Sequence, residues 1–238
     1  MSKHLKRIAS PKKWPIAKKT HIWVTKPNPG PHSLKHAIPL SILFRDILKL
    51  TDNMRETKRV LNEGNVLVDG IVRKNHKFPV GLFDVIQIPK QKVSYRILLD
   101  PSSRLMVNEL DTQDPKKPAQ ILNKTIIRGG KVQLNLHDGT NILGSNDYKT
   151  KDTIILSIPD KSIHKHIKYE QGNLALVIGG THSGELAKIN EIKKVRSGRN
   201  NMVLLEKKDG TVFETIEDYA FVVGTDEPEF NLGGVINE

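Results

Sequence analysis

Lysines and arginines are the residues of this sequence best able to do chemistry, because a run of positive side chains binds phosphate groups. The first 45 of the 238 residues include ten of them and no acid, since the first carboxylate is that of Asp46. We expect five lysines of this segment to contact phosphates: Lys12, Lys13, Lys18, Lys19 and Lys26. Such binding releases counterions and is weakened by salt. The segment therefore predicts a polyanionic partner.

A second group of basic residues falls on two predicted helices and on the hairpin that follows them. Apolar residues at positions 40, 43, 44, 47 and 48 recur with helical spacing, which predicts an amphipathic helix with Pro39 at its first position. The basic candidates for phosphate contacts on these elements are Arg45, Lys49, Arg55, Lys58, Arg59, Arg73 and Lys74. Taken alone, these charges are equally typical of an ordinary solvated face.

The charge of the chain is unevenly distributed. There are 38 basic and 26 acidic residues, a net charge of +12, and ten of the basic residues lie in the first segment. No basic residue follows Lys208, so the far end is acidic. With 37% hydrophobic residues, the chain predicts several small modules more readily than one large core.

The composition also excludes several kinds of site. The chain has no cysteine, which removes disulfides, thiolate nucleophiles and cysteine-based zinc sites and suits a reducing compartment. The longest apolar run, Leu174 to Ile178, is far shorter than the roughly 20 residues that span a bilayer. The first residues are basic with no apolar stretch of a secretory signal. We therefore expect a soluble intracellular protein with no membrane partner.

Residues 1–37 read as an extended basic arm. Five prolines make a regular helix or strand improbable over most of this segment. Trp14 and Trp23 stand among the lysines, and large aromatic residues are rare in disordered tails. We expect the two indole rings to dock either on the protein core or on unstacked bases.

The next segment predicts two helices followed by a small sheet. Asn53 is a candidate N-cap with Glu56 three residues later, and Gly64 lies just beyond the end of the second helix. The pair Asp69 and Gly70 favours a tight hairpin turn, and a further strand is expected over residues 85–88.

This stretch resembles the small RNA-binding module named after ribosomal protein S-four. Its hairpin and closing strand are matched by Val66, Val68, Asp69, Gly70, Asp84 and Ile86, although the module usually has glycine where this chain has Phe83. Residues 78–86, together with Gly30-Pro31-His32 and Ile38-Pro39-Leu40, are similar to the small-subunit ribosomal protein S-four-e family of archaea and eukaryotes. The resemblance implies assembly on small-subunit ribosomal RNA.

A glycine-rich segment follows the apolar strand that ends at Ile178. Its spacing between Gly179 and Gly184 is that of a phosphate-binding loop, but Glu185 stands where the loop needs lysine, and a carboxylate there would repel phosphate. Residues 172–192 instead resemble the KOW motif, a strand-turn-strand element, with Gly184 at the turn glycine. The preceding residues 93–168 read as strands of a central β domain.

No catalytic or metal-binding constellation can be assembled from the sequence. His164 and His166 lie within a lysine-rich stretch, without cysteines or an acidic cluster to complete a metal site. No nucleophile elbow of the G-x-S-x-G type is present. We therefore expect no catalytic residue, metal, cofactor or small-molecule substrate.

The sequence predicts a multidomain α+β protein. Its expected segments are a basic N-terminal arm (1–37), a module of two helices and a small sheet that binds RNA (38–92), a central β domain (93–168) and a C-terminal KOW-containing, SH3-like β-barrel with an acidic end (169–238). Gly64, Gly70 and Gly184 are the expected structural turn residues.

The predicted function is that of a cytoplasmic, RNA-binding structural component of the small ribosomal subunit, acting in translation. Its expected partners are small-subunit ribosomal RNA and neighbouring ribosomal proteins. Two alternatives stay open at this point. One is an RNA-modifying enzyme that carries the same module, of the pseudouridine synthase class. The other is a KOW-bearing translation or transcription factor that binds transiently.

Overall fold

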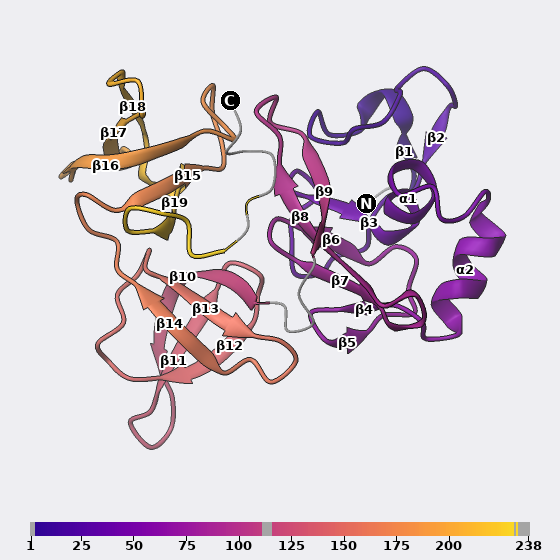
Figure 1. Cartoon of the computed structure of the whole chain (residues 1–238), viewed down its shortest axis with the longest axis horizontal. Coiled ribbons are helices and arrows are strands. Elements are labelled where there is room, and N and C mark those ends of the chain that lie inside the picture. The colour runs from indigo at the N-terminus through magenta and orange to yellow at the C-terminus, as the bar shows by residue number, and fades with distance from the viewer. Residues whose placement is uncertain (1–2, 111–115, 231, 233–238) are drawn as a thin grey trace. The chain divides into compact units, whose positions relative to one another are not determined.

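The structure is a computed structural model that describes residues 3–110, 116–230 and 232. The chain divides into two compact units. The first contains Met1–Leu98, Arg104–Lys117 and Ser157–Asp160, and the second contains Leu99–Ser103, Pro118–Leu156 and Lys161–Glu238. Helices are few and antiparallel strands dominate both units (Figure 1). The mixed α+β class predicted from the sequence is confirmed.

The N-terminal arm is folded into the first unit. Strand β1 (Leu5–Lys6) pairs with β2 (Trp23–Val24), and a 3₁₀ turn, η1 (Arg7–Ala9), follows β1. Trp14 is only 2% exposed, and its indole Nε1 donates a hydrogen bond of 2.6 Å to the carbonyl of Ala37. Of the two expected docking surfaces, protein core or unstacked bases, Trp14 therefore docks on the protein. Trp23 is 56% exposed, so for this ring docking on unstacked bases stays a prediction.

One basic residue of the arm serves the fold itself. Arg7 is buried, and its Nε donates to the carbonyl of Ala17 at 2.6 Å. A buried guanidinium needs such partners, because an unpaired buried charge is costly. Arg7 therefore cross-links the two sides of the arm and is not available to a ligand.

The first predicted helix is less regular than expected. Strand β3 (Ala37–Pro39) pairs with β6 (Pro79–Gly81), so Pro39 ends a strand with extended backbone and does not occupy the first helical position. The helix begins as α1 (Leu40–Ile42) and widens into a π-helical turn, η2 (Leu43–Ile47). There the amide of Leu48 donates to the carbonyl five residues earlier. The apolar face is buried as predicted, because Leu40, Leu43 and Phe44 are inaccessible to solvent.

The second helix, α2 (Met54–Asn62), begins and ends where the sequence predicts. The side chain of Asn53 accepts hydrogen bonds of 3.0 Å from the amides of Arg55 and Glu56, which satisfies two orphan donors of the first turn. The carboxylate of Glu56 accepts the amide of Asp52 at 2.9 Å, one residue before the N-cap. Gly64, with φ of 77°, follows the last turn.

The main sheet of the first unit has the strand order β5-β4-β7-β8-β9. Its strands are β4 (Leu67–Val68), β5 (Ile71–Val72), β7 (Val85–Ile88), β8 (Val93–Leu99) and β9 (Leu105–Leu110), with a 3₁₀ turn, η3 (Pro89–Gln91), between β7 and β8. Asp69 and Gly70 join β4 to β5 with positive φ of 51° and 76°, as a two-residue type I′ turn requires. Strands β8 and β9 lie beyond residue 92 and continue this sheet.

The second unit contains two five-stranded sheets. One has the order β12-β11-β10-β13-β14, from β10 (Lys116–Ile126), β11 (Val132–Leu136), β12 (Asn141–Gly144), β13 (Thr153–Ser157) and β14 (Ile163–Ile167). The other has the order β18-β17-β16-β15-β19, from β15 (Leu174–Val177), β16 (Leu186–Lys193), β17 (Met202–Glu206), β18 (Val212–Ile216) and β19 (Ala220–Gly224), with a 3₁₀ turn, η4 (Glu217–Tyr219), before β19. The first sheet buries one apolar cluster around Ile121, and a second cluster around Val203 also includes Ile155 of β13 and Ile167 of β14.

The glycine-rich segment forms the strand-turn-strand unit β15–β16. Gly184 has φ of 93°, and its amide donates to the carbonyl of Val177 at 2.7 Å. A Cβ at this position would lie 2.5 Å from the carbonyl oxygen of Asp100, so any larger residue would clash with backbone. Part of the acidic end of the chain (231 and 233–238) lies outside the described residues.

Candidate nucleic-acid interface

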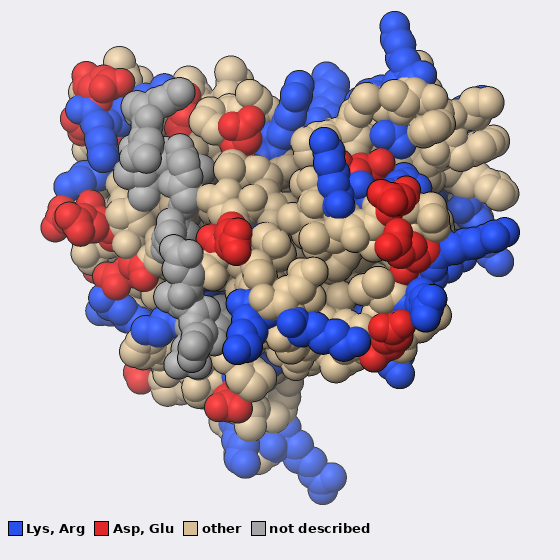
Figure 2. All heavy atoms as spheres, turned by 45° about the vertical axis from the view of Figure 1, so that its right-hand side comes forward, with Lys and Arg blue, Asp and Glu red and all other residues tan. Residues whose placement is uncertain are grey.

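The twelve basic residues predicted to contact RNA all lie in the first unit, and they differ in how far they reach into solvent. The exposed ones are Lys12, Lys19, Lys49, Arg55, Lys58, Arg59 and Lys74. The half-buried ones are Lys13, Lys18, Lys26, Arg45 and Arg73. Figure 2 shows basic side chains projecting from the surface with acidic side chains among them. This face therefore carries charges of both signs. Which of its cations can contact a ligand depends on how far each side chain is exposed and on its partners within the protein.

On α2 the predicted separation of faces is present. Thr57 and Leu61 are buried, whereas Arg55, Lys58 and Arg59 point into solvent. Arg59 also pairs with an acid one turn later, Glu63, at 3.4 Å. Exposed pairs of this kind contribute about 0.3–0.5 kcal/mol, so the guanidinium can leave its partner for a phosphate at little cost.

Several half-buried cations make hydrogen bonds within the protein. Lys18 Nζ donates to the carbonyl of Ser10 at 3.0 Å, which closes a turn of the arm. Lys13 Nζ lies 3.2 Å from the Nδ1 of His36, and burial lowers the pKa of Lys13 below its ordinary value. Both partners, Ser10 and His36, lie within the arm itself, so these two lysines hold the folded path of the arm, a role that their charge alone did not predict.

Arg45 and Arg73 are also engaged within the first unit. Arg45 forms a 2.8 Å ion pair with the next residue, Asp46, and the guanidinium of Arg73 lies 4.4 Å from the centre of the Phe78 ring. Cation–π contacts fix a guanidinium while leaving its edge able to donate hydrogen bonds. Both arginines are thus positioned before any ligand arrives.

A hollow of about 330 Å³ brings the arm and the helices together (Trp23 hollow, below). Its lining residues are Lys3, His4, Leu5, Trp23, Val24, Thr25, Lys26, Arg45, Met54, His76 and Lys77. Of the twelve predicted residues only Lys26 and Arg45 meet here, and the sequence reasoning missed Lys3 and Lys77. Lys3 belongs to the same basic segment as the predicted lysines. The charge of that segment predicts a polyanionic ligand but does not indicate which of its lysines line the hollow.

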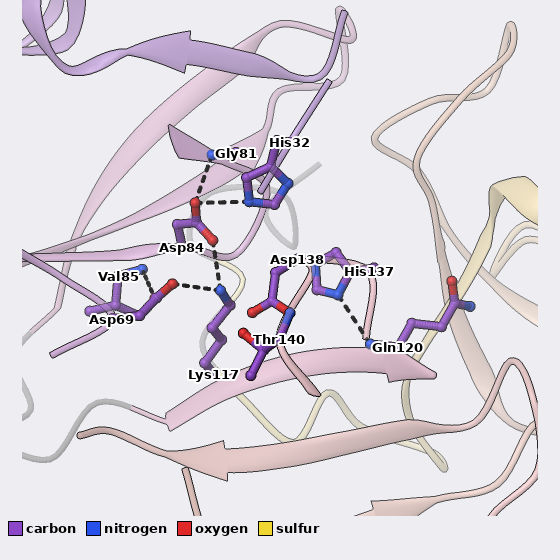
Figure 3. A network of polar contacts seen from close by, with 10 residues as sticks. All are labelled: His32, Asp69, Gly81, Asp84, Val85, Lys117, Gln120, His137, Asp138 and Thr140. Carbon is purple, nitrogen blue, oxygen red and sulfur yellow. Dashed lines mark hydrogen bonds and ion pairs between the residues drawn. The ribbon is translucent and has the colours of Figure 1, made fainter. Parts of the chain in front are cut away.

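A buried network of charges links the arm to the main sheet of the first unit (Figure 3). Lys117 Nζ donates to one carboxylate oxygen each of Asp69 and Asp84, both at 2.7 Å. The second oxygen of Asp84 lies 2.9 Å from Nε2 of His32 and accepts the amide of Gly81 at 2.8 Å. The two aspartates that carry the sequence resemblance are therefore structural, and His32 anchors the end of the arm.

The two aspartates of this network respond differently to burial. Burial alone would raise the pKa of Asp84, but the charges of Lys117 and His32 and their hydrogen bonds lower it below the ordinary value. For Asp69, burial and the neighbouring Asp84 carboxylate raise the pKa to about 6, against the opposing pull of Lys117. The ammonium of Lys117 thus donates to two carboxylates, and it stabilises the charged form of Asp84 more than that of Asp69.

Phe83, which replaces the glycine usual before the closing aspartate, adopts the backbone that glycine would favour. Its φ is 68°, a left-handed conformation that costs a bulky residue strain. The side chain is completely buried, and the amide donates to the carbonyl of Ile97 at 2.8 Å. Burial of a phenyl ring stabilises by about 1.5–3 kcal/mol, which offsets the strain and explains why the module tolerates this departure.

Comparison with known proteins then decides the family. The chain is 53% identical over 233 residues to small ribosomal subunit protein eS4 of Archaeoglobus fulgidus, covering 97% of this chain and 98% of the relative. It is 50% identical over 233 residues to the protein of the same name from Methanosphaera stadtmanae, covering 98% and 96%. The chain belongs to ribosomal family S4e. The family's own model matches residues 85–163, and that of the RS4NT domain matches residues 1–35.

A solved S4e structure has the same fold over most of this chain. The crystal structure of the 30S ribosomal protein S4e from Thermoplasma acidophilum is 32% identical, with a TM-score of 0.67 over 80% of this chain and 96% of the other. The RS4NT match over residues 1–35 coincides with the basic arm, so the arm matches a domain model of its own.

The described residues of this S4e chain contain neither a metal-binding group nor a membrane-spanning helix. Among residues 3–110, 116–230 and 232, no three His, Asp or Glu side chains gather into a group that could hold a metal ion. Within the same described residues, no helix is long and apolar enough to cross a membrane.

The raised pKa of Asp69 predicts a pH-dependent stability. An unfolded aspartate titrates near 4, so between about 4 and 6 the folded protein binds this proton more tightly, and the contribution of Asp69 to the free energy of unfolding falls as the pH rises. The lowered pKa of Asp84 acts below this window, because its stabilisation is lost only as the pH falls under about 4. Asp69→Asn removes the first titration and keeps an oxygen that can accept the amide of Val85.

Urea unfolding of the wild type and of Asp69→Asn between about pH 4 and 7 measures this contribution. The stability of the wild type minus that of the variant should decrease by on the order of 1–3 kcal/mol from about pH 4 to 6 and then level off. A difference that rises with pH over this range would show that Lys117 stabilises the Asp69 carboxylate fully.

Proposed function

We propose that the chain is a structural constituent of the small ribosomal subunit that binds small-subunit ribosomal RNA in translation, and that it resides with the subunit in the cytoplasm. The observation that carries the proposal is identity near 50% over almost the whole length to relatives named small ribosomal subunit protein eS4. The basic first unit supports it, because phosphate neutralisation supplies most of the affinity of such proteins for RNA.

The proposed contacts divide into two kinds. The exposed lysines of the arm, Lys12 and Lys19, neutralise phosphates, and the solvent face of α2 meets the backbone of a structured RNA through Arg55, Lys58 and Arg59. Double-stranded RNA has a deep, narrow major groove that side chains cannot read, so recognition of this kind follows shape and backbone. The lysines that hold the arm, Lys13 and Lys18, contribute by fixing the path of the exposed ones.

The finer architecture is part of the same proposal. The segments are an arm (1–37), an S4-type module (38–92), a central β domain (93–168) and a KOW-containing, SH3-like barrel (169–238). The strand-turn-strand unit β15–β16 with its positive-φ Gly184, in a five-stranded antiparallel sheet where β15 also pairs with β19, supports the last assignment. Neighbouring small-subunit proteins are the further proposed partners.

We place the chain among binding proteins and not among enzymes. The RNA-modifying alternative draws no support from the relatives, which carry the name of a ribosomal protein. Incubating the pure protein with ribosomal RNA and analysing the nucleosides tests this directly. Unchanged nucleosides are expected, and turnover of any nucleoside would overturn the proposal.

Binding to RNA is tested with the purified protein and two ribosomal RNAs. Small-subunit RNA, labelled and titrated with protein in the presence of excess unlabelled large-subunit RNA, should be bound with an affinity that falls as salt is raised. Equal competition by the unlabelled small-subunit and large-subunit RNAs would reduce the chain to a general polyanion binder and contradict the proposal.

A further inference from the structure

We propose that the Trp23 hollow binds an unpaired nucleotide of RNA, with the base against the exposed face of the Trp23 indole and the flanking phosphates on the surrounding cations. This inference rests on the proposed function and deepens it. The phosphate contacts proposed above do not distinguish paired from unpaired nucleotides. A base that stacks on the indole must instead come from a single strand, a bulge or a loop.

Trp23 is held in an exposed position by the backbone. Its exposed fraction is 56%, against 2% for Trp14, the only other tryptophan of the chain. Strand β2 pairs Trp23 with Lys6 of β1, and the next residue, Val24, is buried. Because the backbone on both sides of the ring is fixed, the indole cannot fold back onto the core.

One side of the indole already has an aromatic neighbour. The ring of His4 lies 5.6 Å from that of Trp23, centre to centre, at an angle of 53°. Such a tilted contact orients the larger ring and leaves its remaining area in solvent. A preoriented ring loses little conformational freedom when a ligand stacks on it, which favours binding.

The walls of the Trp23 hollow suit a nucleotide. Its cations come from three separate parts of the chain, namely Lys3 and Lys26 of the arm, Arg45 of η2 and Lys77 before β6. Leu5, Val24 and Met54 add apolar surface, and none of the described lining residues is acidic. An aromatic platform surrounded by cations is the arrangement with which proteins bind single-stranded nucleic acid.

The protonation state of a histidine that lines the hollow also favours a nucleotide. Burial, followed by the charges of Lys58 and Lys77, lowers the pKa of His76, which lines the same hollow. At neutral pH this imidazole is uncharged and can donate or accept a hydrogen bond at a base edge. An acidic protein segment would contact the cations but would leave the indole face uncovered, so a nucleotide fits the whole set of groups better.

Fluorescence of the intact protein tests the proposal, because the two tryptophans differ so strongly in exposure. Saturating single-stranded RNA of about eight nucleotides should quench the emission of solvent-exposed Trp23 and leave that of buried Trp14. Trp23→Ala should abolish the quenching and weaken binding of this RNA roughly 5- to 150-fold. Trp23→Phe, which keeps an aromatic face, should retain most of the affinity.

Ile22→Ala is the matched control. Ile22 precedes Trp23 in the arm and is 72% exposed, so its replacement removes comparable exposed apolar surface without removing a stacking platform. Binding within about twofold of wild type is expected for this variant. An equal loss for Ile22→Ala and Trp23→Ala would show a general effect of the arm and overturn the inference.

The outcomes also separate the inference from the proposed function. If ribosomal RNA binds with its normal salt dependence but saturating single-stranded RNA leaves Trp23 unquenched, the nucleotide site is wrong and the proposed function stands. Quenching by an RNA duplex equal to that by the single strand would likewise overturn an unpaired base. If no ribosomal RNA binds at all, the proposed function itself fails.

Discussion

Replacing Lys117 by Met should lower the free energy of unfolding by about 3–5 kcal/mol at pH 7. The ammonium is buried and donates to Asp69 and Asp84, and its loss leaves the buried Asp84 carboxylate beside the half-buried Asp69 carboxylate without their shared cation. Breaking a buried pair is costly for this reason, even where the intact pair adds little net stability. Urea unfolding followed by circular dichroism measures the change.

The neighbouring lysine supplies the control. Lys116 lies one residue earlier on β10 with an exposed side chain, so Lys116→Met should change stability by no more than about 0.5 kcal/mol. Combining Lys117→Met with Asp84→Asn should cost clearly less than the sum of the two single changes, because they act on one network. Additive effects, or a loss below about 1 kcal/mol for Lys117→Met, would contradict a coupled network.

Changing Arg55, Lys58 and Arg59 together to Glu should weaken binding of small-subunit RNA by on the order of 100-fold or more at physiological salt. Each lost phosphate contact should also lower the slope of log affinity against log salt by about 0.7–0.9. The three side chains are exposed on α2, so folding should be nearly unaffected. Filter binding over a range of salt concentrations and thermal unfolding give the two readouts.

A charge-matched variant separates position from net charge. Lys194, Arg196 and Arg199 are exposed in the second unit after β16, and changing them to Glu alters the net charge by the same amount. This variant should lose markedly less affinity than the α2 variant. Equal losses would mean that overall charge, and not the face of α2, determines the affinity.

The parts of the fold that were predictable depend on neighbouring residues. The Asn53 cap, the Asp69-Gly70 turn and the glycine after α2 each follow from a residue type whose backbone or side-chain preference acts within a few positions. The buried face of the first helix follows from spacing in the same way. The π-helical turn did not, because its hydrogen-bond pattern depends on how η2 packs and not on local preference.

The parts that were not predictable depend on contacts between distant residues. Lys117 is 48 positions from Asp69 and 33 from Asp84, so no local pattern marks it as their partner. The burial of Arg7 and the arm-holding roles of Lys13 and Lys18 have the same origin. A basic run predicts the sign of the ligand, but only the fold separates the cations that face it from those that hold the arm.

The arm is therefore best tested by substitution and not by deletion. Removing residues 1–37 would take away the buried Trp14 and the His32 that pairs with Asp84, so a loss of RNA binding could reflect unfolding. Replacing the exposed Lys12 and Lys19 by Gln changes the charge of the arm and leaves those contacts intact.

Sedimentation of small ribosomal subunits through a high-salt gradient tests the central claim most directly. A structural constituent held by many RNA contacts should remain with the small-subunit particles at about one copy per particle, as measured by quantitative mass spectrometry of each fraction. A transient KOW-bearing factor would be released. Recovery of the protein at the top of the gradient, away from the particles, would contradict its assignment as a structural constituent.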